Sequence, residues 1–408
     1  MSKCPHIDLI NPDNYQEQTP FVLFAELREK DPVHWHEDPE TNVGFWAITK
    51  RDDLDFICRN PIMFSSQEKT CVYAEWDDER IKLLSNMLLN MDPPKHIAFR
   101  KIITPLFKPA AVAKLRPIME RHTRQLLDRI VPKGECDFVT DVGMVLTQTM
   151  IFELVGAPIE DRNMINTWSM TFLGQNDKKY APSIKDVFEA ERKLCEYGFK
   201  LAALYEGKDD DNLTVQLVNA NVDGEKLSTE EFGFFFFLLL LAGPETTFTA
   251  LTNGMKLLIE HPDQLQMLID KPQLIENAVE EILRFDSPVT LFRRTAMEDC
   301  ELGGKQIKKG DKVVFYYSAV NHDEDVFSDP ERFDITRDLG KNLGREHRTF
   351  GSGQHFCLGV HLARMELNVM FEMLLPRMRN PRLIAERTRI RSRSVTTPSS
   401  MRIAFDPS

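Results

Sequence analysis

Residues 350–359 read Phe350-Gly351-Ser352-Gly353-Gln354-His355-Phe356-Cys357-Leu358-Gly359, a glycine-rich loop with a single thiol. A helical pattern follows from residue 360, so we expect Cys357 on the first turn of a helix. Unpaired backbone N–H groups and the helix dipole favour a thiolate there, and the thiolate is the form that binds metal. The glycines let the backbone fold tightly around a bulky planar partner. A lone thiolate, with no second Cys or His at zinc-finger spacing, suits the axial position of a haem.

The spacing Phe-x-x-Gly-x-x-x-Cys-x-Gly resembles the cysteine motif of the cytochrome P450 superfamily, the haem-thiolate monooxygenases. The resemblance implies that Cys357 gives an axial thiolate to heme b (iron protoporphyrin IX), and that Phe350 and Gly351 also contact this cofactor. It also implies the fold class: mainly α with small β-sheets, a triangular helical domain with the haem between a long distal helix and the helix after Cys357. The alternative is a buried structural cysteine in a turn.

A second segment resembles the part of this family that supports the thiolate loop. Glu281 and Arg284 share one face of a predicted helix, residues 274–285, and can pair with each other. Residues 330–333 resemble the segment that completes the family's buried Glu–Arg–Arg network, which implies a structural role for Arg332 as well. Alone, a Glu-x-x-Arg pattern is normally a solvated surface pair.

The longest predicted helix, residues 228–260, is interrupted near its middle. Gly243 and Pro244 both weaken a helix interior, and such breaks often mark function. In the resembling family the distal helix opens here beside bound dioxygen, where an acid and a threonine help to deliver protons. Glu245 and Thr246 occupy these two catalytic positions. The alternative is a chance kink.

Four basic residues resemble the family's contacts to the haem propionates. A helix can begin after two prolines at 93 and 94, so His96 and Arg100 share a face one turn apart and could hold a carboxylate. The resemblance places this pair on one propionate, and it gives Arg294 and His355 further cofactor-binding positions. Individually, each of these residues is more often an ordinary surface base.

The length of 408 residues would by itself suggest two or three domains. A site that draws on residues from 96 to 357 cannot be divided between independent units, so we expect one domain, residues 1–408. Helical periodicity is clear in residues 110–130, 137–156, 183–206, 228–260 and 274–285. Strands are expected in residues 33–36, 44–50, 312–317 and 402–405, the first two as a hairpin.

Charge and hydropathy restrict where the protein acts and what it binds. A net charge of −12 argues against a nucleic-acid partner. Residues 1–13 are polar and show no secretory signal, and the apolar run 232–242 is too short to span a bilayer. The seven cysteines show no paired spacing, which is typical of a reducing compartment. We therefore expect a soluble, cytoplasmic protein without a membrane partner.

The activity that the resemblance implies is hydroxylation of an apolar small molecule, namely a terpenoid, steroid, alkyl or aromatic compound, with dioxygen as the oxidant. The chain has no Gly-x-Gly-x-x-Gly fingerprint or flavin segment, so the two electrons are expected from a ferredoxin with its ferredoxin reductase. Basic residues that would border the docking face are Lys95, Arg100, Lys101, Lys108, Lys341, Arg345, His347 and Arg348. A merely solvated surface is the alternative for them.

The substrate pocket is assigned by position alone, and its candidate residues are Phe236, Leu239, Ala242, Val289, Phe292 and Val395. At helical spacing, Phe and Leu are also common in an ordinary core. Other functions stay open: a peroxide-driven peroxygenase, an oxidative coupling enzyme, a haem-binding sensor, or a metal-free helical interaction protein.

Overall fold

The computed structural model describes residues 8–175, 177–209, 212–221, 224, 226–337 and 342–407. Residues 1–7 and Lys341, on which some expectations fell, lie outside the described residues. The helices are α1 (Phe21–Lys30), α2 (Arg51–Arg59), α3 (Asp78–Leu84), α4 (Lys95–Ile103), α5 (Pro109–Ala113), α6 (Arg116–Ile130), α7 (Met144–Val155), α8 (Arg162–Leu173), α9 (Ile184–Tyr205), α10 (Leu213–Val218), α11 (Thr229–Ala242), α12 (Pro244–Glu260), α13 (Pro262–Asp270), α14 (Ile275–Phe285), α15 (Tyr317–Val320), α16 (Leu343–Glu346) and α17 (Val360–Leu374). The strands are β1 (Val33–His36), β2 (Phe45–Ile48), β3 (Phe64–Ser65), β4 (Glu135–Asp137), β5 (Leu291–Ala296), β6 (Cys300–Leu302), β7 (Lys305–Ile307), β8 (Lys312–Tyr316), β9 (Met378–Leu383), β10 (Thr388–Arg389), β11 (Pro398–Ser400) and β12 (Arg402–Pro407).

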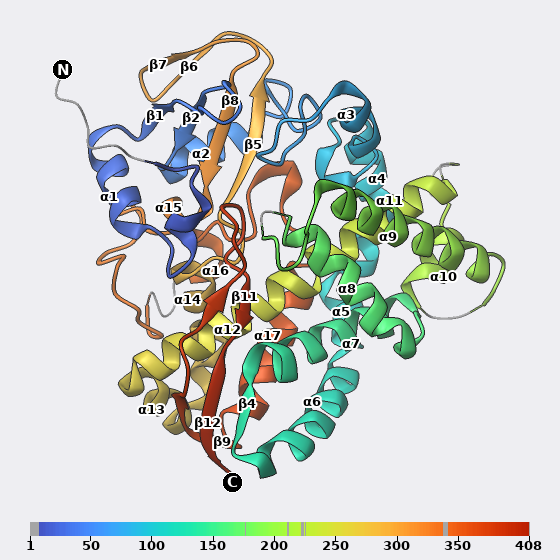
Figure 1. The fold of residues 1–408 in the computed structure, drawn as a ribbon, viewed down its shortest axis with the longest axis vertical. Coiled ribbons are helices and arrows are strands. Elements are labelled where there is room, and N and C mark those ends of the chain that lie inside the picture. Colours follow the sequence, from blue (N-terminus) through green and yellow to red (C-terminus); the bar gives the residue numbers. More distant parts are fainter. Residues whose placement is uncertain are drawn as a thin grey trace.

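Helices fill the right and lower parts of the molecule, and the largest sheet lies at the upper left beside α1, α2 and α15 (Figure 1). Its strand order is β1-β2-β8-β5-β3, in which β2 and β8 are parallel. The predicted hairpin is confirmed, since β1 and β2 pair antiparallel with Val33 opposite Ile48. Strand β5 places Arg294 opposite Val313 of β8, in the interior of the sheet. The predicted class, mainly α with small sheets, is therefore the one observed.

Three of the predicted helices are divided in the structure. The expected helix 110–130 is two helices, α5 and α6, because Pro117 stands in the first turn of α6, where its missing N–H costs nothing. Residues 137–156 begin with the end of strand β4 and a π-helical turn before α7 starts. The expected helix 228–260 ends at Ala242 and restarts at Pro244. Proline or glycine residues therefore account for two of these three helix breaks.

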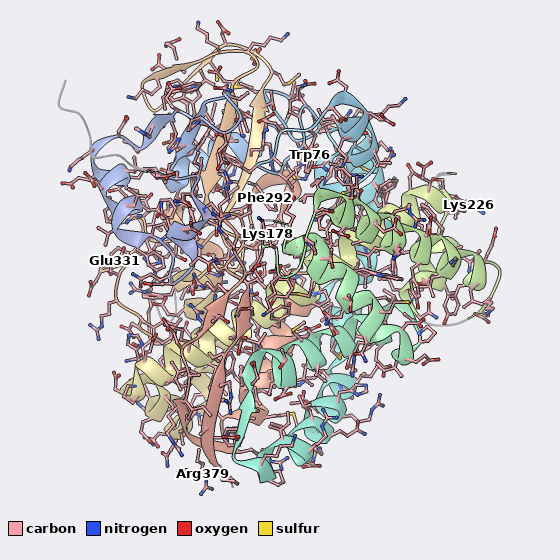
Figure 2. The ribbon with its side chains drawn as sticks, in the orientation of Figure 1. Trp76, Lys178, Lys226, Phe292, Glu331 and Arg379 are labelled. Carbon is pink, nitrogen blue, oxygen red and sulfur yellow. The ribbon has the colours of Figure 1, made fainter. Side chains whose placement is uncertain are left out.

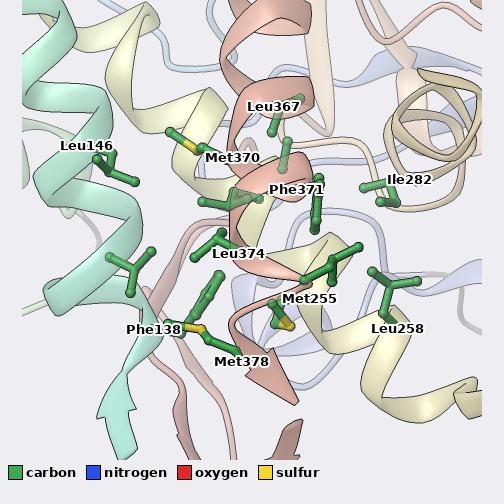
Figure 3. Packing of buried hydrophobic residues seen from close by; sticks show 14 of the residues in the cluster. Phe138, Leu146, Met255, Leu258, Ile282, Leu367, Met370, Phe371, Leu374 and Met378 are labelled. Atoms are coloured by element: carbon green, nitrogen blue, oxygen red, sulfur yellow. The ribbon is translucent and has the colours of Figure 1, made fainter. Parts of the chain in front are cut away.

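The largest hydrophobic cluster surrounds α17 and fixes its place beside α12 and α14 (Figure 3). Met255 of α12, Ile282 of α14 and Phe371 of α17 are each about fully buried within it. Gly254 permits this close approach, because a Cβ there would stand 2.8 Å from atoms of both Ile282 and Phe371. Packing at Phe371 therefore fixes α17 against α12 and α14.

Two helical stretches are long and apolar enough to cross a membrane, Phe138–Val155 and Thr229–Glu260. In the most apolar windows of these stretches, 67% and 72% of the residues are buried inside the fold. That degree of burial is typical of core helices.

Candidate active site

The loop that carries Cys357 is closed on itself and pressed against α2. The N–H of Cys357 donates to the carbonyl of Phe350 at 2.8 Å. Gly351 and Gly353 both have a positive φ, of 79° and 64°. A Cβ at Gly353 would stand 2.1 Å from the carbonyl oxygen of Cys58, so only glycine fits there.

Cys357 precedes the helix instead of lying on its first turn, because α17 begins at Val360 with Gly359 as its N-cap. Burial raises the pKa of the Cys357 thiol, whereas the N–H of Gly359 and the cations of Arg100 and Arg364 act in the opposite direction. The expected contribution of backbone N–H groups is therefore present, and burial opposes it. A metal ion bound to the sulfur would supply what the protein groups do not, since a coordinated thiol loses its proton.

Side chains of the preceding segment tie the thiolate loop to α14. The hydroxyl of Thr349 donates to the carbonyl of Leu283 at 2.7 Å and accepts from the amide of Asn321 at 2.9 Å. The guanidinium of Arg364 lies 4.8 Å from the ring centroid of Phe350, a cation–π distance. The loop is thus held by contacts to α14 before it and by a contact to α17 after it.

The buried network below this loop contains a different arginine from the one that the sequence predicts. Arg284 makes two bonds to Glu281, at 2.7 and 2.8 Å, as predicted. Nε of Arg337 lies 3.1 and 3.2 Å from the two oxygens of Glu281, and both charged side chains are buried. The side chain of Arg332 is 65% exposed, and only its carbonyl joins the network. The prediction of Arg332 is wrong because the turn at 328–337 points its side chain to solvent and that of Arg337 inward.

The four predicted propionate contacts come together in space. The rings of His96 and His355 are 4.2 Å apart between centroids, and Nε2 of His355 lies 3.1 Å from the hydroxyl of Ser66. Burial, together with the positive charges of Arg100 and Arg294, lowers the pKa of His96 to about 4 and that of His355 to about 2.

This basic cluster, formed by His96, Arg100, Arg294 and His355, has a carboxylate near it, Asp92, which acts on His96 but accepts its hydrogen bonds from Ser65 and Ser66. Within the described part of the chain, neither Arg100 nor Arg294 has an ion pair, and Nδ1 of His96 is buried without a partner. Buried cations without a counter-charge are costly. The cluster therefore fits an anionic group that enters from outside the chain.

The break in the distal helix exposes one stripe of an otherwise buried surface. Leu239, Ala242, Gly243 and Thr246 follow one another at helical spacing and are partly or fully accessible, whereas most of their neighbours are buried. The hydroxyl of Thr246 donates to the carbonyl of Ala242 at 2.7 Å, within the helix itself. Leu358, next to Cys357, packs against the hydrophobic cluster that α11 contributes to. The stripe is thus the accessible side of the helix on which the predicted catalytic threonine lies.

Glu245 has surroundings unlike those of Thr246, although the two are neighbours in the chain. It is 4% exposed, and its carboxyl accepts a hydrogen bond from the hydroxyl of Thr397. Burial raises the pKa of Glu245 to about 8. The acid at the helix break is therefore buried, and it is bonded to Thr397, whereas the hydroxyl of Thr246 is bonded to the carbonyl of Ala242.

Most of the predicted pocket residues are partly accessible. Val289 and Val395 pair across an isolated antiparallel bridge, and Phe292 stands in the middle of the molecule, between the sheet and the helices (Figure 2). Phe236 is different, because it is 1% exposed and its ring lies 5.7 Å from that of Tyr197 on α9. Phe236 packs between helices, and its assignment to the pocket is wrong.

A half-buried thiol on a closed loop, a basic cluster whose two arginines have no ion pair among the described residues, and a broken helix with an accessible stripe define a haem-thiolate protein. The chain belongs to the cytochrome P450 family of monooxygenases: residues 144–381 match the family model described as Cytochrome P450. Its cofactor is accordingly haem with an axial cysteine thiolate, and Cys357 is the cysteine in the matching motif.

Curated relatives match this chain over nearly all of its length. A steroid C26-monooxygenase of Mycobacterium tuberculosis is 38% identical, over 95% of this chain and 90% of that protein. Linalool 8-monooxygenase of Pseudomonas putida is 32% identical, over 98% of this chain and 99% of that protein. A solved Mycobacterium marinum cytochrome P450 in complex with pseudoionone superposes with a TM-score of 0.88 at 32% identity, covering 99% of this chain and 100% of that one.

The residues present fit a haem. The basic cluster would receive its two carboxylates, and Cys357 would bind its iron from the side of α17. Sequence reasoning missed Arg337, and it placed Thr397 only in a loop beside the pocket, without its bond to Glu245. A signal for Arg337 was its position in the turn after residue 332, but no pattern in the chain joined Thr397 to Glu245.

Proposed function

We propose that this monooxygenase hydroxylates an apolar terpenoid or steroid, with dioxygen and two electrons from a ferredoxin and its reductase. The observation that carries the proposal is the accessible apolar stripe at Leu239, Ala242 and Thr246 on the helix beside the Cys357 loop. Relatives whose names specify a steroid and linalool support this class of substrate. We further propose that residues 1–408 form one domain and that the protein acts in the cytoplasm.

The residues of the site have separate roles in this proposal. When bound, the haem supplies the chemistry of oxygen activation, and donation from the axial thiolate favours cleavage of the O–O bond. The four residues of the basic cluster bind its propionates and fix its orientation. Thr246 places a hydroxyl at the accessible stripe, where it can pass a proton. The buried Glu245 supplies that proton. Val289, Phe292 and Val395 exclude water and orient the substrate.

The surface proposed for the ferredoxin is narrower than the sequence predicts. His347 is buried against Glu280, at 2.9 Å, and Arg348 is held by Asp55, at 2.7 and 2.8 Å. Lys95 lies 3.6 Å from Glu231 of α11. Of the predicted basic residues that the structure describes, Lys95, Lys101, Lys108 and Arg345 are exposed.

Charge reversal tests the docking surface. The double variant Lys101→Glu and Arg345→Glu should slow reduction by acidic ferredoxins, most at low salt, because steering between unlike charges is screened by ions. A matched control reverses two exposed lysines on α9, Lys185→Glu and Lys200→Glu, and should reduce at the parent rate. Equal reduction rates for parent and double variant across a panel of ferredoxins would exclude this surface.

The haem-thiolate assignment is tested by exchanging one atom. In Cys357→Ser, the reduced, carbon-monoxide-treated protein should lose the absorption spectrum of the parent, whereas Cys58→Ser should keep it. An unchanged spectrum in Cys357→Ser would refute the proposal. A panel of terpenoids, steroids, fatty acids and aromatics, screened by the low-to-high-spin shift of the ferric iron, then identifies the substrate class.

The peroxygenase alternative has its own test, because a peroxygenase needs no proton supply for dioxygen. Hydrogen peroxide added without ferredoxin should give slow turnover with this protein. Fast productive turnover under these conditions would replace the monooxygenase proposal.

A further inference from the structure

Thr397 links the distal helix to a hairpin far along the chain. It stands just before β11, is fully buried, and donates its hydroxyl to the carboxyl of Glu245 at the start of α12. The adjacent Thr396 instead bonds to the carbonyls of residues 287 and 288. Of these two threonines, Thr397 is the one that acts on the acid.

A small cavity lies on another side of Glu245, between α7, α8 and α12. Its polar wall is made by Gln148, Asn166, Ser169 and Glu245, and apolar residues such as Phe248 complete it. The amide of Gln148 donates to the side-chain oxygen of Asn166 at 2.5 Å. The cavity volume is about 20 Å³, and a cavity of roughly 10–15 Å³ or more with polar partners can hold one water. Asn166 is half-buried, so this wall reaches toward the surface between α7 and α8.

Glu245 is also electrostatically isolated. Among the described residues that line the cavity, no other group titrates, and Thr397 on the hairpin side does not titrate either. The pKa of Glu245 is raised to about 8 by burial alone. An acid with such a pKa holds its proton near neutral pH and can still release it.

We propose that Thr397 and this cavity form a proton-loading station for Glu245: the hydroxyl positions the carboxyl, and a water in the cavity returns each proton that the acid releases. The inference rests on the proposed function, in which Glu245 supplies protons toward Thr246. Thr397 is a positioning residue, since it acts through Glu245. In each cycle the carboxyl loses one proton toward Thr246 and takes one from the cavity water, which is recharged from solvent past Asn166.

The role of Thr397 is tested by infrared difference spectroscopy of the haem-loaded protein. The C=O band of protonated Glu245 is assigned by its loss in Glu245→Gln. Thr397→Val should move this band to higher frequency and raise the titration midpoint by about one to two units, because a bond to the charged form is lost. Thr397→Ser should restore both values. Thr252→Val, which removes a buried hydroxyl bonded only to the carbonyl of Phe248 on the same helix, should change neither.

The frequency of the band and its titration midpoint can also overturn the proposed role of Thr397. If Thr397→Val leaves both at the parent values, Thr397 does not position the acid and the inference is overturned. The same variant should divert turnover toward peroxide, with recovery in Thr397→Ser. A loss of coupling that Thr397→Ser does not recover would show that the packing of the hairpin is responsible, and it would also overturn the inference.

Access of water to Glu245 is tested by hydrogen–deuterium exchange of the same band. Asn166→Leu removes a polar partner of the cavity and should slow exchange by about tenfold or more, because exchange then requires local opening of the helices. Asn163→Leu, an exposed position on the same helix, should exchange at the parent rate. Equal rates in parent and Asn166→Leu would refute the water path.

These measurements can fail independently of the proposed function. An unchanged carbon monoxide spectrum in Cys357→Ser would remove the haem-thiolate chemistry, but it would leave the infrared band readable. An unchanged infrared band in Thr397→Val would leave the monooxygenase proposal standing.

Discussion

Replacing Arg337 should destabilise this protein strongly, whereas replacing Arg332 should not. Arg337 bonds to Glu281 and donates to the carbonyls of Ser328, Asp329 and Arg332, at 2.5, 3.0 and 2.6 Å. Its side chain is 6% exposed and that of Glu281 is not exposed at all. Removing one partner of a buried ion pair costs about 3–5 kcal/mol, because charge and carbonyl groups are left without compensation. We therefore expect Arg337→Ala to lower the free energy of unfolding by about that amount.

Arg332→Ala is the matched control, because the two arginines stand in the same turn. The side chain of Arg332 is 65% exposed and lies 4.0 Å from Asp334, so its removal should change the free energy of unfolding by at most about 0.5 kcal/mol. Its carbonyl, which accepts from Arg284 and Arg337, survives the substitution. Arg337→Lys should be intermediate, since an ammonium cannot reproduce the planar fork of donors.

The assay is urea unfolding of each variant, followed by far-ultraviolet circular dichroism, with the carbon monoxide spectrum as a readout of the thiolate loop. Arg337→Ala should unfold at lower urea and lose the parent spectrum at lower urea as well. Equal loss of stability in Arg332→Ala and Arg337→Ala would refute the assignment of the network. An Arg337→Ala protein as stable as the parent would refute it too.

Three further outcomes follow from the same geometry. Thr246→Ala should keep haem and substrate binding but divert most reducing equivalents to peroxide, measured as product formed per electron pair; full coupling would remove Thr246 from proton delivery. Ala242→Phe should fill the accessible stripe and so weaken substrate binding, measured by the spin shift, by at least about tenfold. Phe236→Leu should leave this binding unchanged. The reverse result would restore Phe236 to the pocket. Burial lowers the pKa of Lys312 from 10.5 to about 8. Between about pH 8 and pH 10.5, unfolding therefore takes up a proton at Lys312. The free energy of unfolding of the parent should rise with pH in that window by up to about 3 kcal/mol relative to Lys312→Met. Parallel pH curves for those two proteins would show that Lys312 keeps its proton in the fold.

The sequence by itself determined the features that depend on contiguous residues. The Cys357 loop, the Glu281–Arg284 pair and the helix break at Gly243 are each encoded within a few positions, where backbone chemistry and helical spacing act directly. The grouping of His96, Arg100, Arg294 and His355 into one basic cluster agrees with the resemblance, although no local pattern could have joined them.

Only the tertiary structure decided the features that depend on where an irregular segment points its side chains. Three such features are the pairing of Glu281 with Arg337 instead of Arg332, the burial of Phe236 between helices, and the bond between Thr397 and Glu245, which are 152 positions apart. The physical reason is the same in each case. Spacing along the chain fixes directions within one helix or strand, but the partner of a side chain is fixed by how separate elements pack, and that packing is settled only in the folded molecule.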